Sequence, residues 1–585
     1  MNETTTDLEP SAGATTAAGL PVVPLSKLPA VTQGPQPSPG PERQQGPERQ
    51  QGPEPSQGPP RLGKVLVRAA AVTAALTVAG SALGLVRDQT IAHLFGAGAD
   101  SDAFLIAWTV PEMAATLLIE DAMALVLVPA FSHALARRAA GDSPDPVRRL
   151  VSATLPRLFL LLTCATGALI LGAPVVVELL APGLANPQLA VDCTRLTAVT
   201  VLSFGLTGYL SAALRAHRSY LPPATIYLAY NLGIIVTMLV LHALWGVRAA
   251  AVGVAAGSVL MVLAQLPTFC KHMRAGAPGP RRSSRRERPG RSPLATARPA
   301  LLGFGVLAPV VLFTVCRQSQ VLIERFLAAS LPAGAISHLN YAQKVAQMPM
   351  VLSLMICTVT FPVVAQAVAD GDEGQARRRV ERDLALAGVV VLLGSALVVA
   401  CAPQIIEVLF QRGAFSARDT ATTAAVMRVY ALGLLGHCLV GALGRPFFSA
   451  SRPTWYPAAA MAAGLLVTTV AGALAVRPWG VYGIAAANAA GITVTAALLL
   501  CGLGTRVVSI HVRGVATTLA RLVLAAVAAC AAGLLLTPLV PAALPGLLLG
   551  CLLVPGVFAV TALALRAPEV AGLLGLIKQR FRHVN

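Results

Sequence analysis

The sequence predicts an all-α, polytopic membrane protein of about fourteen transmembrane helices, arranged as two parallel six-helix lobes followed by two C-terminal helices. Three observations lead to this fold class. Hydrophobic residues make up 55% of the 585 residues, and charged residues make up only 12%. The apolar residues form runs long enough to cross a bilayer core of about 30 Å, which takes roughly 20 helical residues. Finally, the same motifs recur in both halves of the chain.

Residues 1–63 differ in composition from everything that follows them. Pro, Gly, Gln, Ser and Thr dominate, and GPERQQ occurs twice, at Gly40 and Gly46. Such a segment buries too little apolar surface to offset its ordering entropy. We therefore expect a disordered cytoplasmic tail.

From Lys64 onward, fourteen apolar segments predict the transmembrane helices. Their limits are 65–87, 102–132, 151–180, 189–213, 221–243, 247–269, 300–329, 334–367, 384–410, 420–448, 455–476, 480–503, 516–539 and 544–566. They divide the chain into an N-lobe (64–272), a basic cytoplasmic loop (273–298), a C-lobe (299–503), a final helix pair (504–567) and a cytoplasmic tail (568–585).

Lys and Arg concentrate in every second connection, as expected for cytoplasmic loops. The residues are Arg137, Arg138, Arg148, Arg149, Arg215, Arg218, Lys271 to Arg298 with RRSSRRER, Arg377 to Arg379, Arg506, Arg513, Lys578, Arg580 and Arg582. We expect both termini in the cytoplasm and the chain in the cell inner (plasma) membrane. The net charge of +19 does not indicate nucleic-acid binding, because the basic residues lie between apolar runs and no reading motif is present.

An internal repeat relates the two lobes. Trp245-Gly246-Val247 reappears 234 residues later as Trp479-Gly480-Val481, and Gly257 and Gly491 each follow eleven residues after the first glycine. Upstream, Ala173-Pro174 reappears as Ala402-Pro403 at an offset of 229. An even number of spans per repeat makes the duplication parallel, and parallel halves suit alternating access around a central cavity. Transport is therefore the leading function class.

Ionisable side chains within the apolar segments are the candidate functional residues, since charge at bilayer depth is costly unless it pairs or faces a cavity. Arg87, Arg317 and Lys344 are cations on the first, seventh and eighth segments. We predict that they bind an anionic substrate, because guanidinium and ammonium groups suit phosphate. Taken singly, each is equally compatible with a structural ion pair. Structural or gating roles are predicted for Asp88, Asp102, Glu324, Pro111 and Pro349, and no catalytic or metal-binding residue is predicted.

Several stretches resemble the MurJ/MviN family of lipid II flippases, within the multidrug/oligosaccharidyl-lipid/polysaccharide exporter superfamily. They are LVRDQTIAHLFGAGADSDAF (85–104), LPAGAISHLNYAQKV (331–345), LFQRGAFSARDT (409–420), YALGL (430–434) and RPFFSASRPTWYP (445–457). The likeness extends over about 64–567. It implies fourteen helices in two lobes and export of a polyprenyl-pyrophosphate-linked peptidoglycan precursor, lipid II or a related glycolipid, with no enzymatic step and no cofactor. Membrane potential or ions would drive the cycle.

The resemblance also assigns residues. Arg87, Asp88 and Asp102 match family positions, and Glu120 matches the family's Ala-Glu-Gly glutamate, which implies a role in substrate binding. Ser81, Ala115 and Thr116 stand where the family has cavity arginines, and Gln343-Lys344 stands where it has Asp-Arg. Membrane lipids and cell-wall synthesis proteins are the implied partners, in addition to the glycolipid.

Three alternatives remain open at this point. A drug or metabolite exporter of the same superfamily would have a mostly apolar cavity with Arg87 directed toward lipid headgroups. A non-transporting partner in cell-wall assembly would account for the missing arginines. An intramembrane glycosyltransferase would use Asp100-Ser101-Asp102 for metal binding and base catalysis. We interpret this triplet instead as the start of the second helix, with Asp100 or Ser101 as its N-cap.

Overall fold

The computed structural model describes residues 62–142, 144–274, 304–354, 372–449, 454–506, 510–567 and 570. In these ranges the chain is helical and contains no strand, so the predicted fold class is confirmed. Leu62–Asn585 forms one compact unit. The predicted tail (1–63) and basic loop (273–298) fall almost entirely outside the described residues, and the proposed lobe boundaries stay predictions.

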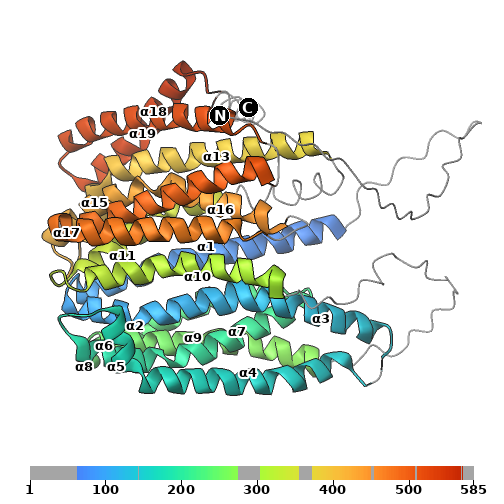
Figure 1. The fold of residues 1–585 in the computed structure, drawn as a ribbon. Helices are drawn as coiled ribbons and strands as arrows, with labels where there is room; N and C mark the ends of the chain where they lie inside the picture. Colours follow the sequence, from blue (N-terminus) through green and yellow to red (C-terminus); the bar gives the residue numbers. More distant parts are fainter. Residues whose placement is uncertain are drawn as a thin grey trace, which may run out of the picture. The chain divides into compact units, whose positions relative to one another are not determined.

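The first half of the bundle runs from blue to green in Figure 1. Its helices are α1 (Leu62–Phe95), α2 (Ala99–Ala115), the π-helix η1 (Thr116–Ala122), α3 (Met123–Ala139), α4 (Pro146–Leu171), α5 (Ala173–Leu180), α6 (Pro187–Thr197), α7 (Val199–Ala216), α8 (Leu221–Trp245) and α9 (Arg248–Arg274). The π-helical turn follows α2 directly, so the second predicted span is one continuous rod with an irregular centre.

The second half runs from yellow-green to red in Figure 1. Its helices are α10 (Phe304–Ala328), α11 (Ala335–Ala346), α13 (Glu373–Ala400), α14 (Ala402–Phe410), α15 (Ala417–Ala431), α16 (Leu434–Ser449), α17 (Tyr456–Arg506), α18 (Val512–Leu536) and α19 (Ala543–Ala564). Helix α17 is 51 residues long, but Gly480 interrupts its helical geometry at the predicted boundary between two spans.

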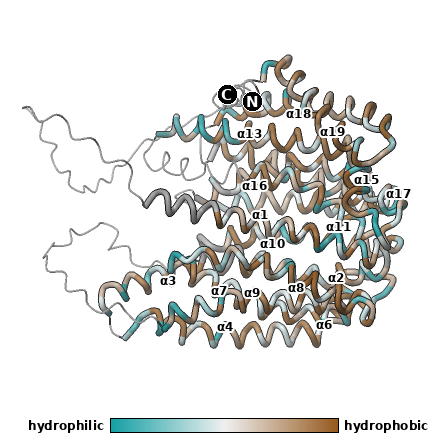
Figure 2. Tube along the Cα trace, turned by 180° about the vertical axis from the view of Figure 1, so that it is seen from behind, coloured by the Kyte–Doolittle hydropathy of each residue, from teal (hydrophilic) through white to brown (hydrophobic). Residues whose placement is uncertain are grey.

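The chain is a multi-pass membrane protein. Nine helices of the described ranges are long and apolar enough to cross a bilayer, or ten if the bent pair α15–α16 counts as one span. Large apolar side chains are exposed along these helices, for example Leu171 at 84% and Leu552 at 78%, which suits contact with lipid. Figure 2 shows the hydrophobic colouring along the rods. The count of fourteen stays a prediction, since the segments 300–329 and 334–367 extend beyond the described residues.

The structure repeats the breaks that the sequence repeat anticipates. Gly172 is the C-cap of α4 and Cys401 is the C-cap of α13, and in both cases an Ala-Pro pair starts a short second helix. Gly246 and Gly480 share an unusual backbone conformation, with φ of 55° and 53° and ψ of −138° and −130°. Only glycine adopts this region without strain, so the two Trp-Gly-Val motifs form the same tight reversal.

The glycines that follow these reversals also have equivalent contacts. A Cβ on Gly257 would meet the carbonyl oxygen of Tyr230 at 2.5 Å, and a Cβ on Gly491 would meet the carbonyl oxygen of Gly464 at 2.5 Å. The two contacted residues are themselves 234 positions apart. The fifth and sixth predicted spans therefore pack in the same way as the eleventh and twelfth.

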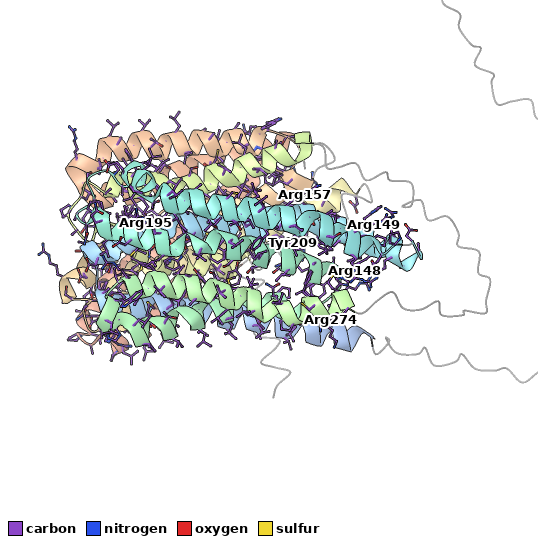
Figure 3. All side chains as sticks on the ribbon, turned by 90° about the horizontal axis from the view of Figure 1, so that it is seen from below. Arg148, Arg149, Arg157, Arg195, Tyr209 and Arg274 are labelled. Atoms are coloured by element: carbon purple, nitrogen blue, oxygen red, sulfur yellow. The ribbon has the colours of Figure 1, made fainter. Side chains whose placement is uncertain are left out.

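Positive charge gathers where α3 ends, α4 begins and α9 ends, which we call the basic end of the bundle. Figure 3 shows Arg148, Arg149 and Arg274 there and Arg195 at the opposite end. The two halves of the bundle meet where α2 lies against α10 and α11, where α1 lies against α14, and where α5 lies against α10. The first of these junctions holds the candidate site.

Candidate functional site

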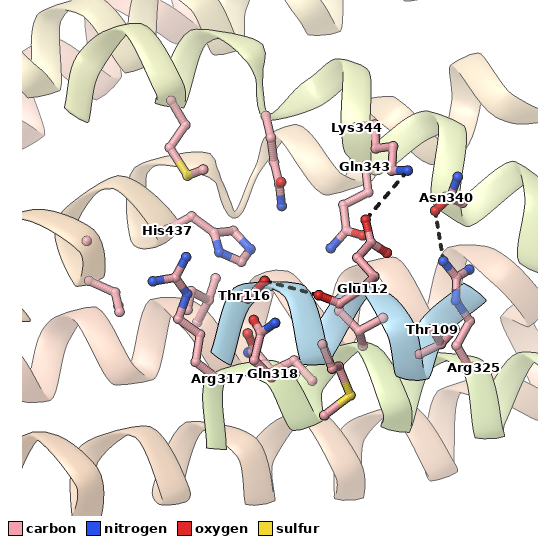
Figure 4. A pocket seen from close by; sticks show the side chains of 18 of the residues that line it. Thr109, Glu112, Thr116, Arg317, Gln318, Arg325, Asn340, Gln343, Lys344 and His437 are labelled. Carbon is pink, nitrogen blue, oxygen red and sulfur yellow. Dashed lines mark hydrogen bonds and ion pairs between the residues drawn. The ribbon is translucent and has the colours of Figure 1, made fainter. Parts of the chain in front are cut away.

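A polar cavity of about 240 Å³ lies between α2 and the helices of the second half. The first half contributes Thr109, Glu112, Met113 and Thr116, and the second half contributes Arg317, Gln318, Gln320, Val321, Arg325, Asn340, Gln343, Lys344, Gln347, Met350, Leu354, His437, Val440, Gly441 and Ile492. Figure 4 shows the labelled side chains around this space. The lining holds three cations and one carboxylate, so it favours an anionic ligand.

Two of the three cations have polar or charged partners within the protein. Arg325 is 4% exposed and donates to the carbonyl oxygen of Ile336 at 3.0 Å and to Asn340 Oδ1 at 2.8 Å, which ties α10 to α11. Lys344 lies between two carboxylates, with its Nζ 3.8 Å from both Asp88 Oδ2 and Glu112 Oε1. Arg317 has no ion-pair partner in the described part of the chain. It is therefore the cation most available to a ligand.

Arg87 lies beside the cavity and is not among its lining residues. Its guanidinium donates to Asp88 Oδ1 through Nε at 3.0 Å and through Nη2 at 2.8 Å, and to Asn231 Oδ1 at 2.9 Å. The group is 4.4 Å from the ring centroid of Trp108, and Lys344 Nζ is 4.6 Å from the same centroid. Arg87 is only 8% exposed, so it neutralises Asp88 and holds α1 to α8. Its substrate contact stays a prediction.

A second polar network extends from the cavity into the second half. Glu324 is 3% exposed and accepts hydrogen bonds from the Tyr430 hydroxyl at 2.7 Å and from the side-chain amide of Asn488. Asn488 Oδ1 also lies 3.1 Å from Nε2 of His437, which lines the cavity. The network joins α10, α15, α16 and α17. Glu324 connects these helices through its hydrogen bonds and is not among the residues that line the cavity.

Asp102 connects the two halves at the end opposite the basic end. Its carboxylate accepts hydrogen bonds from the backbone N–H of Gly334 at 2.7 Å, from the backbone N–H of Ser337 at 2.8 Å and from Ser337 Oγ at 2.6 Å. A carboxylate at a helix N-terminus satisfies free N–H groups and complements the helix dipole. Asp102 of α2 therefore caps α11 of the other half.

Backbone contacts reinforce this cap. The N–H of Ala414 donates to the carbonyl oxygen of His93 at 2.9 Å, which joins the end of α1 to the loop before α15. A Cβ on Gly96 would meet Ala414 O at 2.6 Å, and a Cβ on Gly334 would meet Ala97 O at 2.7 Å. We call these contacts together with Asp102 the latch. Its three loops lie in three of the stretches that carry the family resemblance, 85–104, 331–345 and 409–420.

Three further sequence expectations can be compared with the geometry. The N-cap of α2 is Gly98, so the expectation that Asp100 or Ser101 caps it was wrong. Ser101 Oγ instead donates to the carbonyl oxygen of Gly96 at 2.9 Å. Helix α11 ends at Ala346, three residues before Pro349, whereas α2 continues through Pro111. Glu120 lies in η1, and its side chain is outside the described part.

Sequence reasoning missed the partners of the charged residues. Trp108, Asn231, His437 and Asn488 lie within apolar segments where no pattern marks them, and Glu112 is an ionisable residue of the second segment that was not among the predicted site residues. For Glu112 a signal was present, because it is a charge within an apolar segment, one helical turn after Trp108 and one turn before Thr116. Asn231 is 144 residues from Arg87, and no local pattern connects the two.

Comparison with known proteins identifies the family. The model of the family described as "Lipid II flippase MurJ" matches residues 91–551. A curated relative, the lipid II flippase MurJ of Burkholderia cenocepacia, is 27% identical over 451 residues, covering 75% of this chain and 84% of the relative.

Solved structures show the same fold. A structure titled lipid II flippase MurJ, inward closed conformation, aligns with a TM-score of 0.65 at 18% identity, over 86% of this chain and 100% of the other. An inward-facing multidrug resistance MATE family transporter of the MOP superfamily aligns with a TM-score of 0.57 at 14% identity, over 77% of this chain and 99% of the other. Because the family model spans most of the sequence, this chain belongs to the MurJ lipid II flippase family.

Proposed function

We propose that the protein is a flippase that moves a polyprenyl-pyrophosphate-linked peptidoglycan precursor, lipid II or a related glycolipid, across the cytoplasmic membrane by alternating access. The observation that carries this proposal is the polar, predominantly cationic cavity between the two halves of a member of this family. Such a cavity suits a headgroup that is anionic and strongly hydrated, because its charge requires partners once it leaves water.

Arg317 and Lys344 are the residues that we expect to hold the pyrophosphate. They lie on α10 and α11, two helices of the same half, and both line the cavity. A bound phosphate would give Arg317 its missing counter-charge and would compete with Asp88 and Glu112 for Lys344. Arg87 and Asp88 would then act as the support that positions Lys344.

The latch supplies the moving part of the mechanism. While Asp102 caps α11, the two halves are held together at the end opposite the basic end. Opening of the cavity at this end requires these hydrogen bonds to break and the halves to separate. The arginine-rich basic end faces the cytoplasm in our proposal, following the positive-inside rule, which places both termini inside. The latch is then the gate on the outer side.

No enzymatic step and no cofactor enter this proposal, and the membrane potential or an ion gradient drives the cycle. The observations do not favour a drug exporter. Arg87 is buried in an ion pair instead of facing lipid headgroups, and the cavity lining is rich in amides and charges. The proposed partners are the glycolipid, the surrounding lipids and proteins of cell-wall synthesis.

Complementation tests the proposal. The gene is expressed in a bacterial strain whose own lipid II flippase is depleted, and growth and cell shape are recorded. We expect rescue by the wild-type chain, and loss of rescue at normal expression for Lys344→Ala. Failure of the well-expressed wild-type chain to support growth, or full rescue by Lys344→Ala, would contradict the proposed function or its mechanism, respectively.

A further inference from the structure

The cavity contains more carboxamide side chains than charged ones. Gln318 and Gln320 come from α10, Asn340 and Gln343 come from α11, and Gln347 follows as the C-cap of α11. Phosphate binding alone does not account for this composition. A carboxamide has an acceptor oxygen as well as two N–H donors, whereas a phosphate oxygen in its ionised form only accepts.

These amides are not used by the protein itself. The four glutamine side chains have no hydrogen-bond partner from the protein in the described ranges, whereas the Thr109 and Thr116 hydroxyls and both Nη atoms of Arg325 do have one. Gln320 is the strongest case, because it is 4% exposed and its Nε2 is buried without a partner. An unsatisfied buried amide costs about 1–3 kcal/mol. Gln320 therefore requires a partner from within the cavity, and the three partly exposed glutamines offer further donors and acceptors to the same ligand.

The position of the amides shows which part of a ligand they reach. Gln318 follows Arg317 directly, and Gln343 precedes Lys344. Figure 4 shows these four side chains around one space. A group covalently attached to a phosphate held by the two cations would be within reach of the amides, because all of these side chains line one cavity. The cavity, at about 240 Å³, is also smaller than the roughly 300–1,000 Å³ typical of sites for drug-sized ligands, so it encloses only part of a glycopeptide.

We infer that the carboxamides of Gln318, Gln320, Gln343 and Gln347 recognise the sugar attached directly to the pyrophosphate, through its hydroxyl and acetamido groups. This inference rests on the proposed function and makes these residues determinants of headgroup specificity. Each neutral group of such a sugar both donates and accepts, as the carboxamides do. The cations bind the charge that all polyprenyl pyrophosphates share, and the amides distinguish a glycosylated lipid from a bare one.

Binding to two lipid probes tests the inference. Full-length protein in nanodiscs is titrated with undecaprenyl pyrophosphate and with undecaprenyl pyrophosphate that carries one N-acetylhexosamine. We expect the wild-type chain to bind the glycosylated probe more tightly. Gln343→Leu and Gln320→Leu each reduce that preference by about three- to tenfold, the effect of one neutral hydrogen bond. Lys344→Gln lowers the affinity for both probes to the same extent and leaves the preference for the glycosylated probe unchanged.

A matched control is available on α14. Gln404 also has a buried side-chain atom without a partner, its Oε1, but it does not line the cavity. Gln404→Leu is expected to keep the wild-type preference. The inference is overturned if the wild-type chain binds both probes equally, or if Gln343→Leu and Gln320→Leu keep the full preference. If folded wild-type protein binds neither probe, the proposed function fails, and the inference fails with it.

Discussion

The charged residues in and beside the cavity differ in how far the protein already neutralises them. Arg87 has two hydrogen bonds to Asp88 and one to Asn231, while Arg317 has no ion-pair partner among the residues described. A sequence shows that both are arginines within apolar segments, but it does not show which one is neutralised. In this structure Arg87 is neutralised by Asp88, whereas Arg317 lines the cavity without an ion pair in the described ranges.

The buried pair of Arg87 and Asp88 leads to a prediction about stability. Arg87→Ala leaves a carboxylate that is 5% exposed with only the more distant Lys344 as a counter-charge, and breaking such a pair costs about 3–5 kcal/mol. We expect the double variant Arg87→Ala/Asp88→Ala to be more stable than Arg87→Ala alone, measured as the thermal unfolding midpoint of the purified protein.

The exposed pair of Arg248 and Asp192 provides the control for this measurement. Its side chains are 46% and 40% exposed, so Arg248→Ala should cost no more than about 1 kcal/mol. An unfolding midpoint for Arg87→Ala as high as that of Arg248→Ala would show that the pair of Arg87 and Asp88 does not hold α1 in place.

The latch leads to a second prediction at the level of one residue. Asp102→Ala removes three hydrogen bonds to α11, each worth about 1.5–3 kcal/mol because the acceptor is charged. We expect the latch end to open more often, so that a cysteine introduced at Thr109 reacts faster with an impermeant thiol reagent added outside the cell. Asp100→Ala is the control, because Asp100 has only a 3.4 Å contact with Asn186. Equal labelling rates in both variants would exclude Asp102 as a gate residue.

At the scale of elements, the repeat gives each half the same broken helices. Gly246 and Gly480 reverse the chain with matching φ and ψ, and a Cβ at either position would meet nothing within 4 Å. Substitution by alanine therefore costs backbone strain alone, about 1–3 kcal/mol. We expect Gly246→Ala and Gly480→Ala to lower the unfolding midpoint by similar amounts.

Gly98 is the control for these two glycines. It also has open space around a built Cβ, but its φ of −150° is accessible to any residue. Gly98→Ala should leave the unfolding midpoint unchanged. If Gly480→Ala also left the unfolding midpoint unchanged, the chain reversal would not require glycine. The requirement for glycine could then not explain why both Trp-Gly-Val motifs have the same backbone conformation.

The helices show what sequence patterns can and cannot predict. The predicted apolar segments are helical in the described ranges, since apolar runs of sufficient length must become helices in a bilayer. Hydropathy did not resolve the breaks at Gly172 and Cys401, because both sides of each break are equally apolar. The internal repeat aligned these two positions at an offset of 229, but a repeat shows only that two segments are similar and does not show that a helix breaks there. The cap of α11 by Asp102 spans 232 residues, and local patterns carry no information at that range.

At the scale of the whole molecule, a cationic cavity lies between two related halves that are joined at one end by a latch. We propose that this arrangement gives the cations a common role in transport, beyond the stability of single helices. We expect Arg317→Ala and Lys344→Ala each to slow transport at least tenfold. Arg195 lies at the end of the bundle opposite the basic end and does not line the cavity, so Arg195→Ala should have no effect on transport. Equal transport rates in all three variants would show that transport does not depend on the cations of the cavity.

The most direct test of the central claim is translocation in reconstituted vesicles. Full-length protein is inserted into liposomes that contain fluorescent lipid II, and the fraction of the headgroup that becomes accessible to a quencher outside the vesicles is followed over time under an imposed membrane potential. We predict that accessibility rises faster with the wild-type chain than in protein-free vesicles, and that Arg317→Ala abolishes most of this gain. A wild-type rate equal to that of protein-free vesicles would contradict the claim that this protein is a lipid II flippase.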